Sequence, residues 1–367
     1  MDIDFNSIDF AKNPNITLAY LREQRGLYPY ELPDGTKTWL ITRRNEIDFV
    51  LKKTNVFKVS SIDKKDYNKN PFSKSIPSPS HLLATDGDYH KRLRAPLETF
   101  FTKDLLDSYR DYIKEEVRSI LKNLKSGDQY DLVSEFSYKL PVKVISKMLG
   151  LDWDEQLPEY AIALQMVKEN SEFLPKVTDF HQILRNTISN KKLNKDSSKN
   201  IISELISAGL TDEEVLSMSL LLFIAGSGTT ASLISLGIRK IFNENIQNVD
   251  FKNLVDEILF ITPPANSAFP RYVHEDIIID GTQLKKGDLC FVILTSANYD
   301  YEKEDPLKVY YSFSKGIHHC IGWYVAKIQA EIAYEEFYLN FPKTTIIEEK
   351  WISNIVSRNI ERLLVKL

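Results

Sequence analysis

The residues best suited to do chemistry surround Cys320. This cysteine lies in a short stretch that contains two glycines, Gly316-Ile-His-His-Cys320-Ile-Gly322, and a helix-compatible run from Trp323 to Phe337 follows at once. Glycine permits a tight backbone, and backbone N–H groups at the start of a helix stabilise the negative charge of a thiolate. One interpretation is a thiolate that binds a metal. The alternative for an isolated cysteine is a buried structural thiol beside a turn.

A zinc site made of His318, His319 and Cys320 is disfavoured. Adjacent side chains do not converge easily on one tetrahedral ion, and the sequence shows no second cluster of such ligands. The other cysteine, Cys290, lies in a different context, so the two cysteines form neither a zinc motif of Cys pairs nor a disulfide framework.

A second pair of residues has the spacing to bind an acidic group. His90 and Arg94 are one helical turn apart, so in a helix both lie on one face, as recognition of a carboxylate requires. Taken alone, the pair could equally be part of a solvated helix face.

A small-residue segment, Ala225-Gly226-Ser-Gly228-Thr229-Thr230, lies inside a long apolar helical pattern. A glycine in a helix costs about 1 kcal/mol relative to alanine, so the two glycines indicate a close approach by another group or a local kink. A plain crossing of two helices at small residues is the alternative.

The cysteine loop resembles the haem-binding loop of the cytochrome P450 family, F-x-x-G-x-x-x-C-x-G. The resemblance implies haem b (iron protoporphyrin IX) as the cofactor, with Cys320 as the metal ligand that binds its iron. A bound haem with oxygen would then be the close neighbour of the small-residue segment. The motif positions are occupied by Phe313, Gly316, Cys320 and Gly322.

The segment 86–94, DGDYHKRLR, is similar to the family's D-P-P-x-H-x-x-x-R segment, whose His and Arg bind haem propionates. The resemblance therefore gives His90 and Arg94 this role. Arg271 and His318 stand where the family places further propionate partners. Together these four residues would surround the two carboxylates of the haem.

The segment 225–230 resembles the family's oxygen-binding A-G-x-D/E-T-T. The resemblance implies a catalytic role for Ala225, Gly226, Thr229 and Thr230, with the Thr229 hydroxyl assisting proton delivery. Position 228, where the family usually has an acid, is glycine. Water could carry the protons instead, and some family members with altered acid positions use peroxide or reduce nitric oxide.

A second departure from the family lies at Glu257-Ile-Leu-Phe260, in place of E-x-x-R. Phe260 cannot pair with Glu257, and a buried unpaired carboxylate would cost several kcal/mol or become protonated. The family's second arginine is also missing from residues 301–312. The sequence therefore predicts that the whole triad is replaced, with Lys308 as a candidate partner of Glu257.

The elements that must position these residues are mainly helical. A capping box at Thr211 and Glu214 predicts a helix to Phe242, about 32 residues and roughly 48 Å long. Short strands are expected after Pro264, at IIIDG and at LCFVILTSAN (289–298).

The resemblance implies a mainly α fold with minor β, a P450-like single domain over 1–367 with a long central helix and small β-sheets. Its parts are a small N-terminal sheet at about 27–60, a helical part at about 89–262, and a C-terminal α+β part that carries the haem-ligand loop 313–322.

Composition limits the partners. The 367-residue chain has 47 Lys and Arg against 51 Asp and Glu, for a formal net charge of −4. This charge gives no global attraction to nucleic acid or to an anionic membrane. The N-terminus lacks a signal pattern, and the longest apolar run, Leu216 to Ala225, is too short to span a membrane. We therefore expect a cytoplasmic protein that binds neither nucleic acid nor membrane.

The resemblance implies a monooxygenase that inserts one oxygen atom from O2 into an apolar small-molecule substrate, using electrons from a separate ferredoxin-type partner. Two alternatives stay open: peroxide-driven oxidation or nitric oxide reduction by the same haem, and a haem-binding or sensing protein with little turnover. A basic docking face for the electron donor is expected at Lys91, Arg92, Lys103, Lys315 and Lys327.

Overall fold

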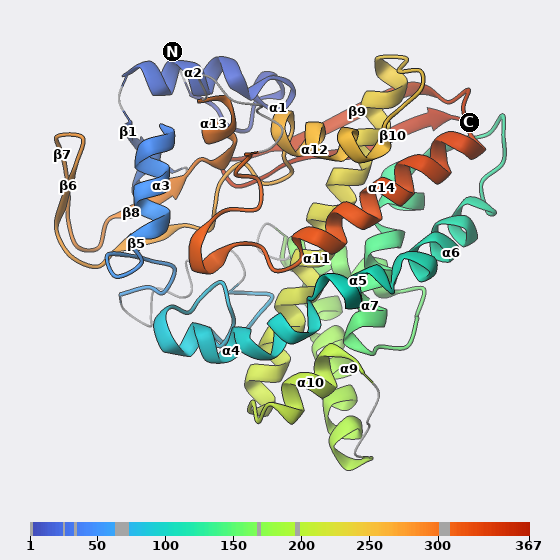
Figure 1. Cartoon of the computed structure of the whole chain (residues 1–367), viewed down its shortest axis with the longest axis horizontal. Coiled ribbons are helices and arrows are strands. Elements are labelled where there is room, and N and C mark those ends of the chain that lie inside the picture. Colours follow the sequence, from blue (N-terminus) through green and yellow to red (C-terminus); the bar gives the residue numbers. More distant parts are fainter. Residues whose placement is uncertain are drawn as a thin grey trace.

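The longest element of the computed structural model is helix α11, Asp212–Asn243, which has 32 residues. The structure describes residues 3–24, 26–32, 35–62, 73–166, 170–194, 199–300 and 309–367. The Thr211 side chain accepts a hydrogen bond from the Glu214 N–H, and the Glu214 carboxylate accepts one from the Thr211 N–H, so the predicted capping box is confirmed. In Figure 1 α11 (yellow) runs through the middle of the molecule.

The other helices pack around α11 and make the fold mainly helical, as predicted. Those with the most contact to α11 are α7 (Lys139–Leu149) and α14 (Trp323–Asn340). The remaining helices are α1 Ile8–Lys12, α2 Pro14–Gln24, α3 Arg44–Lys52, α4 Gly87–Phe100, α5 Lys103–Asp107, α6 Arg110–Leu121, α8 Leu157–Met166, α9 Leu174–Leu193, α10 Ile201–Ser207, α12 Phe251–Ile261 and α13 Leu294–Tyr299.

A five-stranded sheet covers one side of the helical part, in the order β1-β2-β8-β5-β3. Strands β1 (Leu27–Glu31), β2 (Lys37–Ile41) and β3 (Phe57–Lys58) come from the region where the sequence predicts a small sheet. Strands β5 (Arg271–Val273) and β8 (Leu289–Val292) come from the C-terminal half. Because β2 pairs with β8 and β3 with β5, one sheet joins the N-terminal and C-terminal halves of the chain.

The remaining strands lie in two smaller sheets. Strands β4 (Gln129–Asp131), β10 (Arg358–Lys366) and β9 (Thr345–Ser353) form one in that order. Strands β6 (Ile277–Ile279) and β7 (Thr282–Leu284) form a hairpin.

The strand expected over 289–298 is too long. Strand β8 ends at Val292 and helix α13 begins at Leu294. Ala297 and Asn298 belong to residue types that are depleted in strands. The Asn298 side chain is instead buried and donates to the Phe260 carbonyl at 3.0 Å, which fixes the segment against α12.

Among the described residues, one helix, α11, is long and apolar enough to cross a membrane, and 78% of its most apolar window is buried inside the protein. Its apolar character is thus accounted for by its place in the core.

Candidate functional site

The loop before α14 has a conformation that only a few residue types adopt. Gly316 has φ +73°, and a Cβ there would lie 2.8 Å from the Leu51 carbonyl oxygen of α3. Glycine is therefore required at this position both for its backbone angle and for space. The Cys320 N–H donates to the Phe313 carbonyl at 2.9 Å, which closes the loop around the segment between them.

Gly322 has a different role from the one expected. It has φ −87° and immediately precedes α14, and a Cβ there would meet nothing closer than Val325 at 3.8 Å. The tight backbone predicted for this glycine is wrong, because any residue can adopt its conformation. Its backbone N–H is instead a hydrogen-bond donor to the Cys320 thiol.

The Cys320 thiol is accessible and yet surrounded by protein. The residue is exposed to solvent, while the protein around it raises the pKa of its thiol. The Gly322 N–H and the charge of Arg94 act in the opposite direction and favour the thiolate. A bound group could therefore reach the sulfur, and the Gly322 N–H and Arg94 would offset part of the cost of burying the thiolate charge.

Helix α11 has two accessible positions on a stretch that is otherwise mostly buried. Ala225 and Thr229 are exposed and one turn apart, and the Thr229 hydroxyl donates to the Ala225 carbonyl at 2.7 Å. Thr230 is buried, with 3% of its surface exposed. Of the two threonines, Thr229 is thus the one that a ligand could contact.

Protein side chains lie next to both glycines of this segment, and the bound haem expected as their neighbour stays a prediction. A Cβ on Gly226 would lie 3.4 Å from Ile145 of α7, an ordinary contact. A Cβ on Gly228 would overlap the carboxamide of Gln165, which belongs to α8.

A buried polar cluster lies beside the cysteine loop. The His318 and His90 rings are 4.5 Å apart, and His90 Nε2 lies 3.1 Å from the Ile317 carbonyl oxygen. Arg94 donates to the His319 carbonyl at 3.0 Å, and Arg271 is 3% exposed and donates to the Phe269 carbonyl. The structure therefore brings together the four residues that the sequence assigned to propionate binding.

Asp86 is also part of this cluster, a role that the sequence did not reveal. Its carboxylate accepts from the Ser60 N–H at 2.8 Å and lies 3.2 Å from His318 Nε2. Burial acts to raise its pKa, but these hydrogen bonds lower the pKa of Asp86 to about 2. Its place at the start of the D-x-x-x-H segment was the available signal.

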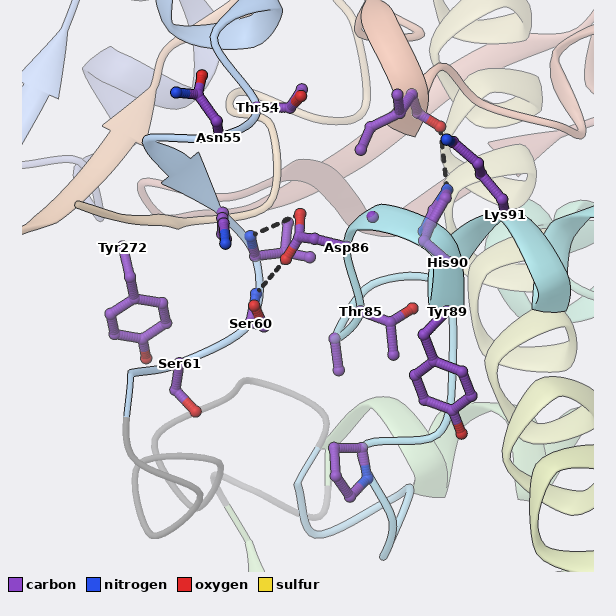
Figure 2. A pocket seen from close by; sticks show the side chains of 16 residues that line it. Thr54, Asn55, Ser60, Ser61, Thr85, Asp86, Tyr89, His90, Lys91 and Tyr272 are labelled. Carbon is purple, nitrogen blue, oxygen red and sulfur yellow. Dashed lines mark hydrogen bonds between the residues drawn. The ribbon is translucent and has the colours of Figure 1, made fainter. Parts of the chain in front are cut away.

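A cavity of about 630 Å³ adjoins Asp86 and His90 of the cluster. Figure 2 shows the side chains that line it. Thr85, Asp86, Tyr89 and His90 line one side of it, and Tyr272 lies across from them. Solvent or a small ligand can therefore come close to the polar cluster from this side.

Glu257 has a partner other than Phe260, as the sequence required, but it is not buried. Glu257 pairs with Lys240 of α11 at 3.1 Å, and 36% of its side chain is exposed. Lys308, the partner suggested from the sequence, lies outside the described residues. Phe260 packs against Tyr299, with ring centroids 6.1 Å apart.

The preceding residue, Asp256, connects three segments instead. Its carboxylate accepts from the Tyr310 hydroxyl at 2.7 Å and from Lys327 Nζ at 2.5 Å. Asp256 belongs to α12 and Lys327 to α14, and Tyr310 precedes the cysteine loop. These three residues, the Asp256 cluster, link α12 to the segment before the cysteine loop. In the family, the glutamate of E-x-x-R and its arginines stand in this place.

Asn298 fixes the same loop from α13. Its side chain donates to the Ser312 hydroxyl at 3.0 Å and accepts from the Tyr311 N–H at 2.7 Å. Two independent polar contacts therefore hold residues 310–312 directly before the cysteine loop.

The expected basic docking face carries less free charge than its composition indicates. Each of the five cations has a partner in the described residues: Lys91–Asp88, Arg92–Glu214, Lys315–Asp48, Lys327–Asp256, and Lys103 over the Tyr324 ring. A docking role for this face stays a prediction.

Comparisons with known proteins agree with the fold and the cysteine loop. No family model matches the chain. Polyketide biosynthesis cytochrome P450 PksS of Bacillus subtilis is 26% identical over 393 residues, covering 98% of this chain and 97% of that protein. Cytochrome P450 119 of Sulfolobus acidocaldarius is 29% identical over 310 residues, covering 80% and 82%.

The solved structure of PksS from Bacillus subtilis superposes with a TM-score of 0.86 at 25% identity and covers 100% of both chains. A helical fold of this kind, with a cysteine loop before α14, is that of the haem-thiolate proteins of the cytochrome P450 type. The chain belongs to the cytochrome P450 monooxygenase family.

The polar cluster fits the haem that this family implies. His318 Nδ1 is buried and has no hydrogen-bond partner among the described residues. Arg271 is buried with only the Asp86 carboxylate attracting it. In the neutral ring His318 Nε2 donates to Asp86, so Nδ1 is an acceptor and becomes a donor only when the ring is protonated. The buried positive charge of Arg271 requires an acidic partner, and a propionate would supply one.

Proposed function

We propose that the chain is a monooxygenase that inserts one oxygen atom from O2 into an apolar small molecule, with electrons from a separate ferredoxin-type protein. The observation that carries this proposal is the accessible residue Cys320, in a loop that directly adjoins the buried polar cluster of His90, Arg94, Arg271 and His318. The haem, when bound, supplies the iron at which O2 is activated.

The roles of the protein residues follow from their positions. Cys320 binds the iron, and Gly316 gives the loop its conformation beside α3. Thr229 presents a hydroxyl that can hold a proton, and the small Ala225 leaves room for substrate next to it. Gly226 and Thr230 shape this part of the helix.

The remaining assignments concern the cofactor. His90, Arg94, Arg271 and His318 bind the propionates of haem b. Phe313 and Gly322 flank the ligand cysteine in sequence and, through their backbone groups, contact it in space.

Two broader expectations are part of the proposal. A single domain over residues 1–367 is supported by the shared sheet, in which β2 pairs with β8 from the other end of the chain. The other is a cytoplasmic location, which stays a prediction from the sequence.

The oxidant is tested with purified haem-loaded protein, a surrogate ferredoxin and its reductase, and a panel of apolar substrates. We expect product that carries one ¹⁸O atom from ¹⁸O₂, and at least about tenfold less product in Thr229→Ala, because proton delivery in such steps is worth this much or more. Product from hydrogen peroxide alone, with none from O2, would favour the peroxide alternative. Consumption of nitric oxide would favour the alternative of nitric oxide reduction. No turnover with any oxidant would favour the haem-binding or sensing protein.

Arg94 gives a test of cofactor binding that needs no turnover. Arg94→Ala is expected to speed haem transfer to apomyoglobin by about 30-fold, because a charge-assisted hydrogen bond of about 2 kcal/mol is lost. The control is Glu98→Gln, which removes only the negative charge of the surface partner of Arg94, 2.8 Å away. Equal rates of haem transfer in the two variants would show that Arg94 does not bind a propionate.

A further inference from the structure

The position of the missing family acid is filled from another helix. Gly228 of α11 has no side chain, and any Cβ there would overlap Oε1 and Nε2 of Gln165. Gly226, two residues earlier, has room for a Cβ beside Ile145. In this structure Gln165 therefore occupies the space that a side chain at position 228 would take.

Gln165 is held in this place by two hydrogen bonds. Its Oε1 accepts from the Tyr138 hydroxyl at 3.3 Å, and its Nε2 donates to the Ala161 carbonyl at 3.4 Å. Tyr138 directly precedes α7, so the pair reaches α11 from two neighbouring helices. Burial raises the pKa of Tyr138 to about 12, so its phenol stays protonated and remains a donor.

Gln165 reaches the helix position that directly precedes Thr229. Tyr138 and Gln165 are half-buried, and Gly228 immediately precedes the exposed Thr229. A carboxamide and a phenol each offer a donor and an acceptor without a charge. The two groups can therefore orient water as the carboxylate of an acid would, but they hold no acidic proton of their own.

We propose that Gln165 and Tyr138 replace the missing acid at position 228 as positioning residues for proton delivery, a role that rests on the proposed function. The overall reaction joins one atom of O2 to the substrate and reduces the other to water with two electrons and two protons. The electrons come from the ferredoxin-type partner. The protons come from solvent through water that this pair orients toward the Thr229 hydroxyl, which passes on its own proton and takes up another.

The first test measures thermal unfolding of the haem-loaded protein and does not depend on turnover. Gly226→Ala is expected to keep or raise Tm by about 2 °C, because alanine favours the helix. Gly228→Ala is expected to lower Tm, since its Cβ displaces Gln165. In a Gln165→Ala background Gly228→Ala should raise Tm as Gly226→Ala does. An equal effect of Gly228→Ala in both backgrounds would overturn the placement of Gln165.

The second test separates proton delivery from packing. Gln165→Leu and Tyr138→Phe are expected to lower product formed per NADPH at least about tenfold, with hydrogen peroxide released instead, while KM stays unchanged. The D2O isotope effect on kcat should also change. Gln165→Glu, which has the same shape and adds a carboxylate, should restore or exceed the wild-type yield.

The outcomes are distinguishable from a failure of the proposed function. Wild-type yield and isotope effect in both Gln165→Leu and Tyr138→Phe would overturn the proton role. If the wild-type protein itself gave no product with O2, the proposed monooxygenase and this role would both fall, whereas the unfolding measurements would still decide whether Gln165 fills position 228.

Discussion

Replacement of Cys320 by serine is expected to abolish the long-wavelength Soret band that the dithionite-reduced protein shows with carbon monoxide. That band requires a thiolate bound to the haem iron, and serine has no sulfur to supply it. In the structure Cys320 is the accessible cysteine, and it lies next to the polar cluster that fits the haem propionates. The effect is therefore a complete loss of the band.

Cys290→Ser is the matched control, because Cys290 is fully buried and belongs to strand β8, not to the cysteine loop. It should keep the thiolate band in whatever fraction of the protein folds. Persistence of the band in Cys320→Ser, or a wild-type spectrum typical of histidine ligation, would refute the assignment of Cys320 as the iron ligand.

The features that could be predicted from the sequence are those encoded by neighbouring residues. The start of α11 depends on Thr211 and Glu214, three positions apart, and the structure shows both hydrogen bonds of the box. The cysteine loop is one continuous motif that ends where α14 begins. Because the spacing of such residues fixes their geometry, the sequence alone indicates them.

The features that the sequence did not reveal depend on contacts between distant segments. Adjacent helix residues point about 100° apart. Whether Asp256 or Glu257 contacts the segment before the cysteine loop therefore depends on how α12 is rotated about its axis. In the structure Glu257 faces Lys240, and Asp256 faces the loop. The occupation of position 228 by Gln165 likewise requires the packing of α8 on α11.

The Asp256 cluster gives the second large prediction. Asp256→Ala is expected to lower Tm by about 4 °C and to speed haem loss by about tenfold. The variant removes the acceptor shared by Tyr310 and Lys327, worth about 2 kcal/mol for a partly exposed charged pair with a hydrogen bond. Both charged side chains are only 21% exposed, so water compensates for the loss incompletely.

Glu257→Ala provides the comparison, because the adjacent carboxylate is more exposed and contacts Lys240 away from the loop. We expect it to change Tm by about 1 °C at most, as for a surface ion pair, and to leave haem loss unchanged.

The ferrous carbon monoxide spectrum distinguishes positioning of the loop from general stability, because a displaced Cys320 would lose thiolate ligation below the unfolding temperature. Asp256→Asn, which keeps an acceptor for Tyr310, should retain most of the thiolate band. If Glu257→Ala had the larger effect on haem loss, the anchor would be the glutamate, as in the family's own motif, and the Asp256 cluster would only stabilise the surface between α12 and α14.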